Sequence, residues 1–422
     1  MITAVIVGCG DRATVYVEAA YELGGFKVVA AVDPDPERRK YYHEKVGVEE
    51  GNLYSDMSDV LKQGKIADCV INGTMDKLHV ETAVPFLEQG YDMLLEKPIA
   101  TNEEGLLKIR DTARKSGSKL MICHVLRYAP FYKKAKELIL NGEIGEITHI
   151  ETTERVGIYH SSVSYIRGKW NNEEECGSGM LLAKCCHDLD LISWFNNTTK
   201  PVMVSSFGGR NFFIPEKAPV GSGTRCMVDC PANIREKCNF EAEEMYMHHD
   251  VFPWYPWQCT GKNYQDVTEE EKRQSLLTYN PHGRCIYKTN ADIVDHQALM
   301  VQFANGSTAT HSMITASEVP MRKLYIKGTL GELEGGAGGL LTLRKYDKKL
   351  GRSIEQEVDI VDTTGDNRGH YGGDSRLVKD FISLMRGEKP SISCTNIEDS
   401  ITGHLIGFKA EESRKTGKTI NM

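Results

Sequence analysis

Residues 1–13 read MITAVIVGCGDRA, and this segment decides the fold. The apolar run 2–7 predicts a strand that is buried on both faces. Gly8 and Gly10 allow a tight turn in which a phosphate can approach the backbone, and Ala13 lets a helix pack closely against a strand. The segment therefore predicts a strand, a glycine turn and the start of a helix.

The second half of this unit supports a dinucleotide site. Residues 28–33 read VVAAVD, a further buried strand that ends in Asp33. A carboxylate at this point can bind the adenosine ribose hydroxyls. The helix between the strands would direct free N–H groups at a pyrophosphate, with Asp11 and Arg12 in its first turn. A glycine-rich turn in another α/β domain is the alternative.

Charge and composition exclude several classes of partner. The 422 residues carry a net charge of −8, with both signs interspersed and without a dense run of Lys or Arg. We therefore expect neither nucleic acid nor membrane as a partner. A strand that begins next to residue 1 leaves no room for a signal peptide, so we expect a cytoplasmic protein. Its 12 cysteines would then be thiols or metal ligands.

The hydrophobic pattern changes near residue 124. Strands alternate with helices before it, which predicts a parallel, doubly wound sheet. After it, strands with one wet face predict an α+β domain with a mostly antiparallel open sheet. We place the domains at 1–124 and 125–422. Residues 208–290 are rich in Gly, Pro, Cys, Trp and Tyr and form an insertion that we expect to have no large core.

Glu96-Lys97-Pro98 follows the apolar strand 93–95. Ligands of open α/β sheets lie beyond the carboxyl ends of the strands, so Lys97 would point into the cofactor crevice. There it could stabilise negative charge on a substrate oxygen. A solvated loop lysine is the alternative.

Several separate motifs together resemble one family. They are Gly8 to Ala13, Asp33, Thr74 with His79, Glu96-Lys97-Pro98, Arg127 with Pro130, and His187 with Asp190. Their order and spacing are similar to those of the glucose–fructose oxidoreductase, inositol dehydrogenase and rhizopine-catabolism (Gfo/Idh/MocA) family. The resemblance implies a Rossmann domain, an open-sheet domain that supports dimers or tetramers, and NAD or NADP as cofactor. It also implies that Lys97 is catalytic, with Glu96, Thr74 and His79 on the cofactor side.

The predicted helix 180–195 matches the second catalytic segment of that family. His187 falls on the catalytic histidine, and an imidazole with a near-neutral pKa suits proton transfer. Many members carry an aspartate four residues earlier, where this chain has Ala183. Lys184 could reach the same cleft and is a further catalytic candidate. For Asp190 we prefer a structural role.

Two more polar segments are candidates for substrate contact. Arg127 follows the last strand of the first domain, where an interdomain salt bridge is an equal alternative. His370 lies in the turn GHYGGD, and similar turns in the family approach the substrate. For Asp374, at the end of that turn, we favour a helix N-cap.

Four cysteines of the insertion have the soft donors of a structural zinc site. They are Cys226, Cys230, Cys238 and Cys285. His248, His249 or Cys259 could replace the distant Cys285. Free thiols and an iron–sulfur cluster are the alternatives. The aromatic residues at 254, 255 and 257 would either cover the substrate cleft or form a small satellite core.

These features predict an NAD-dependent oxidoreductase. Its substrate would be a hydroxyl or carbonyl of a sugar, inositol or glycoside, and its assembly a homodimer or homotetramer. Asp33 favours NAD, although Arg38 and Arg39 are close enough to accommodate NADP. The runner-up is an enzyme that retains NAD and modifies or cleaves glycosides through a transient keto-sugar; a non-catalytic sensor ranks third.

Overall fold

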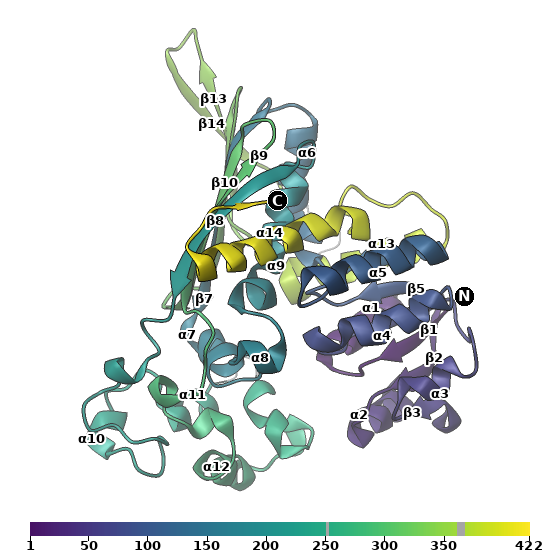
Figure 1. Ribbon diagram of the computed structural model, residues 1–422, viewed down its shortest axis with the longest axis vertical. Coiled ribbons are helices and arrows are strands. Elements are labelled where there is room, and N and C mark those ends of the chain that lie inside the picture. The colour runs from purple at the N-terminus through teal and green to yellow at the C-terminus, as the bar shows by residue number, and fades with distance from the viewer. Residues whose placement is uncertain (250–252, 361–367) are drawn as a thin grey trace.

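The computed structural model describes residues 1–249, 253–360 and 368–422. Two units stand side by side, each built on one sheet, and the segment between β8 and β9 extends away from the second sheet (Figure 1). No helix in the described part of the chain has the length and apolar character needed to cross a membrane.

The first sheet is parallel throughout, with the order β3-β2-β1-β4-β5-β6. Its strands are β1 (Ile2–Val7), β2 (Phe26–Val32), β3 (Leu53–Tyr54), β4 (Cys69–Asn72), β5 (Asp92–Leu95) and β6 (Leu120–Ile122). The helices between them are α1 (Asp11–Leu23), α2 (Pro36–Tyr41), α3 (Met57–Leu61), α4 (His79–Glu88) and α5 (Glu103–Ser116). The strand order reverses between β1 and β4, and such a reversal opens a ligand crevice at the carboxyl ends of the strands. The predicted doubly wound sheet is confirmed.

The second sheet has nine strands in the order β14-β13-β12-β11-β7-β10-β9-β8-β15. Its strands are β7 (Ile147–Gly157), β8 (Pro201–Gly209), β9 (His296–Phe303), β10 (Thr308–Ser317), β11 (Met321–Gly328), β12 (Glu332–Gly335), β13 (Leu341–Asp347), β14 (Arg352–Val358) and β15 (Ile420–Asn421). Among the described strands of this sheet, only β7 and β10 pair in parallel. The predicted open, mostly antiparallel sheet is therefore confirmed.

Helices cover one face of this sheet and link it to the first unit. α6 (Pro130–Leu140) follows the first unit, α9 (Met180–Phe195) packs on β7 and β10, and α14 (Ile397–Thr416) packs on α9 and β8. α13 (Arg368–Met385) returns to pack on α1. The C-terminal segment therefore shares its contacts between both units.

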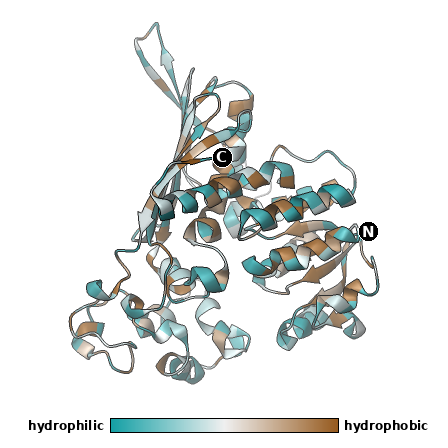
Figure 2. Cartoon of the chain, in the orientation of Figure 1, coloured by the Kyte–Doolittle hydropathy of each residue, from teal (hydrophilic) through white to brown (hydrophobic). Residues whose placement is uncertain are grey.

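The sequence pattern missed β12 to β14. Six of the seven residues of β14 are exposed, so the strand shows no apolar alternation. Figure 2 shows this outer hairpin as largely hydrophilic, in contrast to the apolar strands of the first sheet. Strands are recognised in a sequence by a buried face, and β14 has almost none.

The insertion connects β8 to β9, which are antiparallel neighbours. The insertion contains the short helices α10 (Ala232–Arg235), α11 (Ala242–Met247) and α12 (Glu269–Leu277). Two further short helices, α7 (Ile158–His160) and α8 (Glu173–Cys176), lie between β7 and α9 in the chain. Phe213, Phe240 and Trp257 are buried and belong to the core of the second unit. The expectation of an insertion without a large core is therefore wrong, because the insertion extends the core that the second sheet already has.

Candidate active site

The turn after β1 has the geometry that a phosphate needs. Gly8 has a φ of +82°, and a Cβ there would lie 2.7 Å from the backbone nitrogen of Thr74. Gly10 is the N-cap of α1, and no side chain caps this helix. The first N–H groups of α1 therefore point out of the turn, as in helix-terminal anion sites. Ala13 meets Gly73, where an added Cβ would lie 2.9 Å from the alanine Cβ.

Asp33 is fixed at the end of β2. Its carboxylate accepts the N–H groups of Cys9 at 2.8 Å and of Asp35 at 2.9 Å. Arg38 lies 3.5 Å from the same carboxylate, with about half of its side chain exposed. A carboxylate that can bind the ribose hydroxyls and a guanidinium that can pair with a 2′-phosphate therefore lie next to each other.

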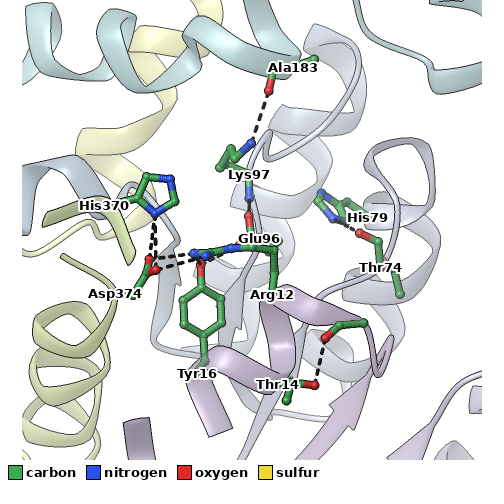
Figure 3. Close-up of polar contacts among 11 residues, drawn as sticks. Arg12, Thr14, Tyr16, Thr74, His79, Glu96, Lys97, Ala183, His370 and Asp374 are labelled. Atoms are coloured by element: carbon green, nitrogen blue, oxygen red, sulfur yellow. Dashed lines mark hydrogen bonds and ion pairs between the residues drawn. The ribbon is translucent and has the colours of Figure 1, made fainter. Parts of the chain in front are cut away.

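Arg12 is the centre of a buried ionic network (Figure 3). Its guanidinium donates to Glu96 at 3.0 Å, to Asp374 at 2.7 and 3.1 Å, and to the hydroxyl of Tyr16. This arrangement ties α1, the end of β5 and α13 together. We predicted Arg12 as a cofactor contact, but its guanidinium is bound by two carboxylates and a hydroxyl of the protein.

Lys97 lies where β5 ends, between the two units. Its Nζ donates to the carbonyl of Ala183 at 3.3 Å, on the helix α9 (Figure 3). Its own backbone N–H donates to Glu96, and the peptide bond to Pro98 is cis. Although burial opposes the charged form of Glu96, Arg12 and Lys97 lower the pKa of this carboxyl. Glu96 is thus held as an anion beneath the lysine.

His187 lies one turn further along α9 than Ala183. Its side chain is buried, and its Nδ1 has no hydrogen-bond partner among the residues that the structure describes. The ring lies 5.6 Å from that of His370 and 6.0 Å from that of His124, between centroids. Burial lowers the pKa of His187 well below its usual value, and Lys97 and His370 add to this shift. The imidazole is therefore neutral at pH 7 and able to accept a proton.

His370 links this histidine to the Arg12 network. Its Nδ1 lies 3.2 Å from a carboxylate oxygen of Asp374, which also pairs with Arg12. The backbone of residues 369–372 is left-handed, and the His370 ring in this segment lies next to that of His187. The N-cap interpretation of Asp374 is wrong, because the carboxylate joins two side chains instead of capping a helix. Sequence reasoning could not find this role, since Arg12 is 362 positions away.

Lys184 faces the second sheet. Its Nζ lies 3.3 Å from Glu154 on β7, a carboxylate that also pairs with Arg322. Arg322 lies 3.2 Å from Asp188 as well, so two acids and two bases form a buried cluster. Burial lowers the pKa of Lys184, whereas Glu154 raises it. No motif pointed to Glu154 on β7 or to Arg322 on β11.

Three other predicted residues brace the structure. Arg127 is fully buried and forms a bidentate pair with Asp190 at 2.6 and 2.7 Å. Substrate contact by Arg127 is therefore not supported, because its charge is already neutralised within the protein; the structural role of Asp190 agrees with the prediction. His79 binds the carbonyls of Pro98 and Thr74 through its two ring nitrogens and so holds the loops that flank the crevice.

The four cysteines predicted as metal ligands meet around one small cavity. Within the described residues, however, no three of their sulfur atoms lie within 4.8 Å of one another, so this spacing alone does not support a bound zinc ion. His248, His249 and Cys259 do not line the cavity. The segment at 254–258 reaches the nucleotide turn, where Gln258 donates to Asp11 at 3.4 Å.

Comparison with known proteins defines the class. Residues 2–124 match the model of the oxidoreductase family with an NAD-binding Rossmann fold, and residues 132–224 match the GFO/IDH/MocA C-terminal domain. The chain therefore belongs to the GFO/IDH/MocA oxidoreductase family.

Individual relatives are more distant. The chain is 27% identical to the putative oxidoreductase YteT of Bacillus subtilis over 86% of this chain and 83% of that protein. It is 22% identical to inositol 2-dehydrogenase 2 of Saccharopolyspora erythraea, over 45% and 52% of the two chains. The fold is similar to the crystal structure of an oxidoreductase from Agrobacterium radiobacter in complex with NAD+, L-tartaric acid and magnesium. That likeness has a TM-score of 0.68 at 15% identity and covers 100% and 98% of the chains.

Proposed function

We propose that this protein is an NAD-dependent oxidoreductase acting on a secondary hydroxyl, or the corresponding carbonyl, of a sugar, inositol or related polyol. One observation carries the proposal: Lys97, at the carboxyl end of β5, reaches the helix turn that precedes His187. A cation and a neutral base thus face the crevice beside the glycine turn. The inositol dehydrogenase among the relatives supports the substrate class.

The residues of the turn fit a dinucleotide. The free N–H groups at the start of α1 would hold the pyrophosphate and Asp33 the adenosine ribose, with Thr74 on the nicotinamide side. When bound there, NAD supplies a hydride acceptor. Gly8 and Gly10 provide the space, and Ala13 provides the close packing beneath them. Asp11, Arg12, His79 and Glu96 would support this site from its rim.

The chain's own residues would move the proton. Because the imidazole of His187 is neutral, one of its ring nitrogens, Nδ1 or Nε2, carries no proton. That nitrogen can take the proton of the substrate hydroxyl. Lys97 would stabilise the negative charge that develops on the oxygen. His370, held by Asp374, would contact the substrate beside His187. Lys184, paired with Glu154, would position α9 rather than take the proton itself.

The cofactor preference follows from two neighbours. Asp33 repels a 2′-phosphate, whereas the half-exposed Arg38 could pair with one. Two backbone N–H groups hold the carboxylate of Asp33 in place, and we propose a preference for NAD with some use of NADP. The redox-neutral glycoside alternative is not favoured by the relatives reported above.

The decisive test is a screen of sugars, inositols and glycosides with NAD and NADP. We expect stoichiometric NADH formation with at least one polyol. Lys97→Ala should lower turnover by about 10³-fold while NAD still binds, measured by fluorescence titration. Lys62→Ala is the matched control, because Lys62 lies on the surface in a pair with Asp59. Full activity of Lys97→Ala would remove the lysine from the mechanism.

We also propose a homodimer or homotetramer. Phe207, Met300 and Ile314 are exposed on one face of the neighbouring strands β8, β9 and β10. Adjacent exposed apolar side chains mark interaction surfaces. Light scattering after gel filtration should report an oligomer for the wild type and a smaller species for Phe207→Asp. A monomeric wild type would contradict the proposal.

A further inference from the structure

Four cysteines of the insertion converge although 59 residues separate the first from the last. A two-residue bridge aligns the outer pair: the N–H of Cys226 donates to Gly283 at 2.9 Å, and the N–H of Cys285 donates to Thr224 at 2.8 Å. Cys230 follows in the next turn, and Cys238 precedes α11. All four side chains line the same small cavity.

A buried cation lies against this cavity. Arg167 is buried, and its Nη2 lies 3.6 Å from the sulfur of Cys226. A cation this close to sulfur is suited to a negatively charged group of thiolates.

We propose that Cys226, Cys230, Cys238 and Cys285 bind one metal centre through four thiolates, each thiol losing its proton on binding. The centre is either a zinc ion or an iron–sulfur cluster, both of which four cysteines can hold. A zinc ion, with Zn–S bonds of about 2.3 Å, requires the sulfur atoms to turn further into the cavity. An iron–sulfur cluster is larger than a zinc ion and holds its cysteines further apart.

A second group of ligand-type residues shows why the cavity is the better site. Cys185, Asp188 and His311 bring their ligand atoms within 4.8 Å of one another. Asp188, however, already pairs with Arg322 at 3.2 Å, so a cation there would compete with a buried guanidinium. The four cysteines that line the cavity are free thiols, and none of them forms a disulfide.

The centre would hold part of the cofactor site in place. Arg167, which contacts Cys226, also donates to the carbonyls of Arg284 and Phe240. Arg167 therefore ties the segments that carry Cys238 and Cys285 to its own loop, which precedes α9. The same insertion contacts the nucleotide turn through Gln258 and Asp11. Loss of the metal should consequently loosen the insertion and weaken dinucleotide binding.

The test is metal analysis of the full chain, purified without oxygen and without an affinity tag that binds metal. We expect either about one zinc per chain, or iron and acid-labile sulfide in equal amounts with visible absorbance. The first result identifies zinc and the second a cluster. Less than about one tenth of a metal equivalent per chain of the folded protein would overturn the proposal.

Variants and a chemical probe assign the ligands. Cys230→Ser and Cys285→Ser should lose most of the metal, whereas Cys259→Ser, an exposed cysteine of the same insertion that does not line the cavity, should keep it. If the serine variants do not fold, mercurial titration of the wild type replaces them. Metal release in step with modification of four thiols supports the site, and release without thiol modification contradicts it. This test does not use the redox activity, so it stands apart from the proposed function.

Discussion

The nucleotide turn and the histidine cleft lie side by side, but the chain builds them in different ways. The turn needs one local segment, Gly8 to Ala13, with Asp33 two elements later. The cleft takes Lys97 from the end of β5, His187 from α9 and His370 from the non-helical start of α13. A cofactor site can thus be encoded locally, whereas the reactive site depends on how distant elements pack.

The two regions also differ in how their charges are arranged. The turn offers free N–H groups and a carboxylate held by backbone donors. The cleft rests on buried ion pairs, in which Arg12 and Asp374 orient His370 while the pKa of His187 is lowered by burial. The turn is suited to binding, and the cleft is suited to proton transfer.

The largest expected effect is the loss of the base in the cleft. His187→Gln should lower turnover by at least about 10³-fold, because no other side chain replaces a positioned proton acceptor. The affinity for NAD should change little, since the turn is untouched. Steady-state kinetics and NAD titration measure both quantities. His149→Gln, on β7 next to Thr308, is the control and should behave as the wild type.

A second prediction concerns the scaffold between the two regions. Arg127→Met would leave Asp190 buried without its partner, and removal of one member of such a pair costs about 3–5 kcal/mol of unfolding free energy. Urea denaturation should show this loss. If the stability stays within about 1 kcal/mol of the wild type, Arg127 is not the brace that the structure shows, and its predicted substrate contact would need to be reconsidered.

The third prediction tests the link between the ionic network and the cleft. Asp374→Asn should reduce kcat about 10- to 100-fold, because the hydrogen bond from His370 loses its charged acceptor. As a positioning residue, Asp374 should act through His370. His370→Gln should therefore add little to Asp374→Asn in the double variant. Independent, additive losses would contradict the link.

The fourth prediction is a pH effect on stability. Burial lowers the pKa of His282 to about 4 and of His404 to about 3. The N–H of Ile99 donates to Nε2 of His404, which fixes the neutral ring. The unfolded chain binds these protons first, so stability is full above pH 6.5 and is lost as the pH falls. Each histidine should cost about 2 kcal/mol at pH 5.

Denaturation at pH 7 and at pH 5 measures this loss. To isolate His404, the loss of unfolding free energy between the two pH values is compared for the wild type and His404→Gln. The amide oxygen of this glutamine can still accept the hydrogen bond from Ile99. The variant should lose about 2 kcal/mol less than the wild type between the two pH values. An equal loss in both proteins would show that His404 does not change its protonation on unfolding.

The smallest effect concerns the turn. Asp33→Ala should reduce the preference for NAD over NADP by about tenfold, because the carboxylate no longer repels a 2′-phosphate and Arg38 is released. The ratio of kcat/KM with the two cofactors measures this. Arg38→Ala is the opposite control and should increase the preference for NAD. An unchanged ratio in both variants would contradict the role of this pair.

The sequence predicted the parts whose signals are local. The first sheet, the helix 180–195 and the family follow from motifs and apolar periodicity. The ion pairs of Arg12 with Asp374 and of Lys184 with Glu154 could not be predicted, because each joins strands and helices that only the tertiary fold brings together. Asp374 was misjudged for the same reason, whereas the salt bridge of Arg127 was one of the two alternatives that the sequence left open.

The central claim is that a dinucleotide in the turn presents its reactive ring to the cleft. A crystal structure of the protein with NAD+ tests it most directly. We expect the pyrophosphate at the N-terminus of α1 and the nicotinamide C4 facing Lys97 and His187, with room for a substrate carbon at about 3–3.5 Å. A nicotinamide ring directed away from these two side chains, or NAD+ bound elsewhere, would contradict it.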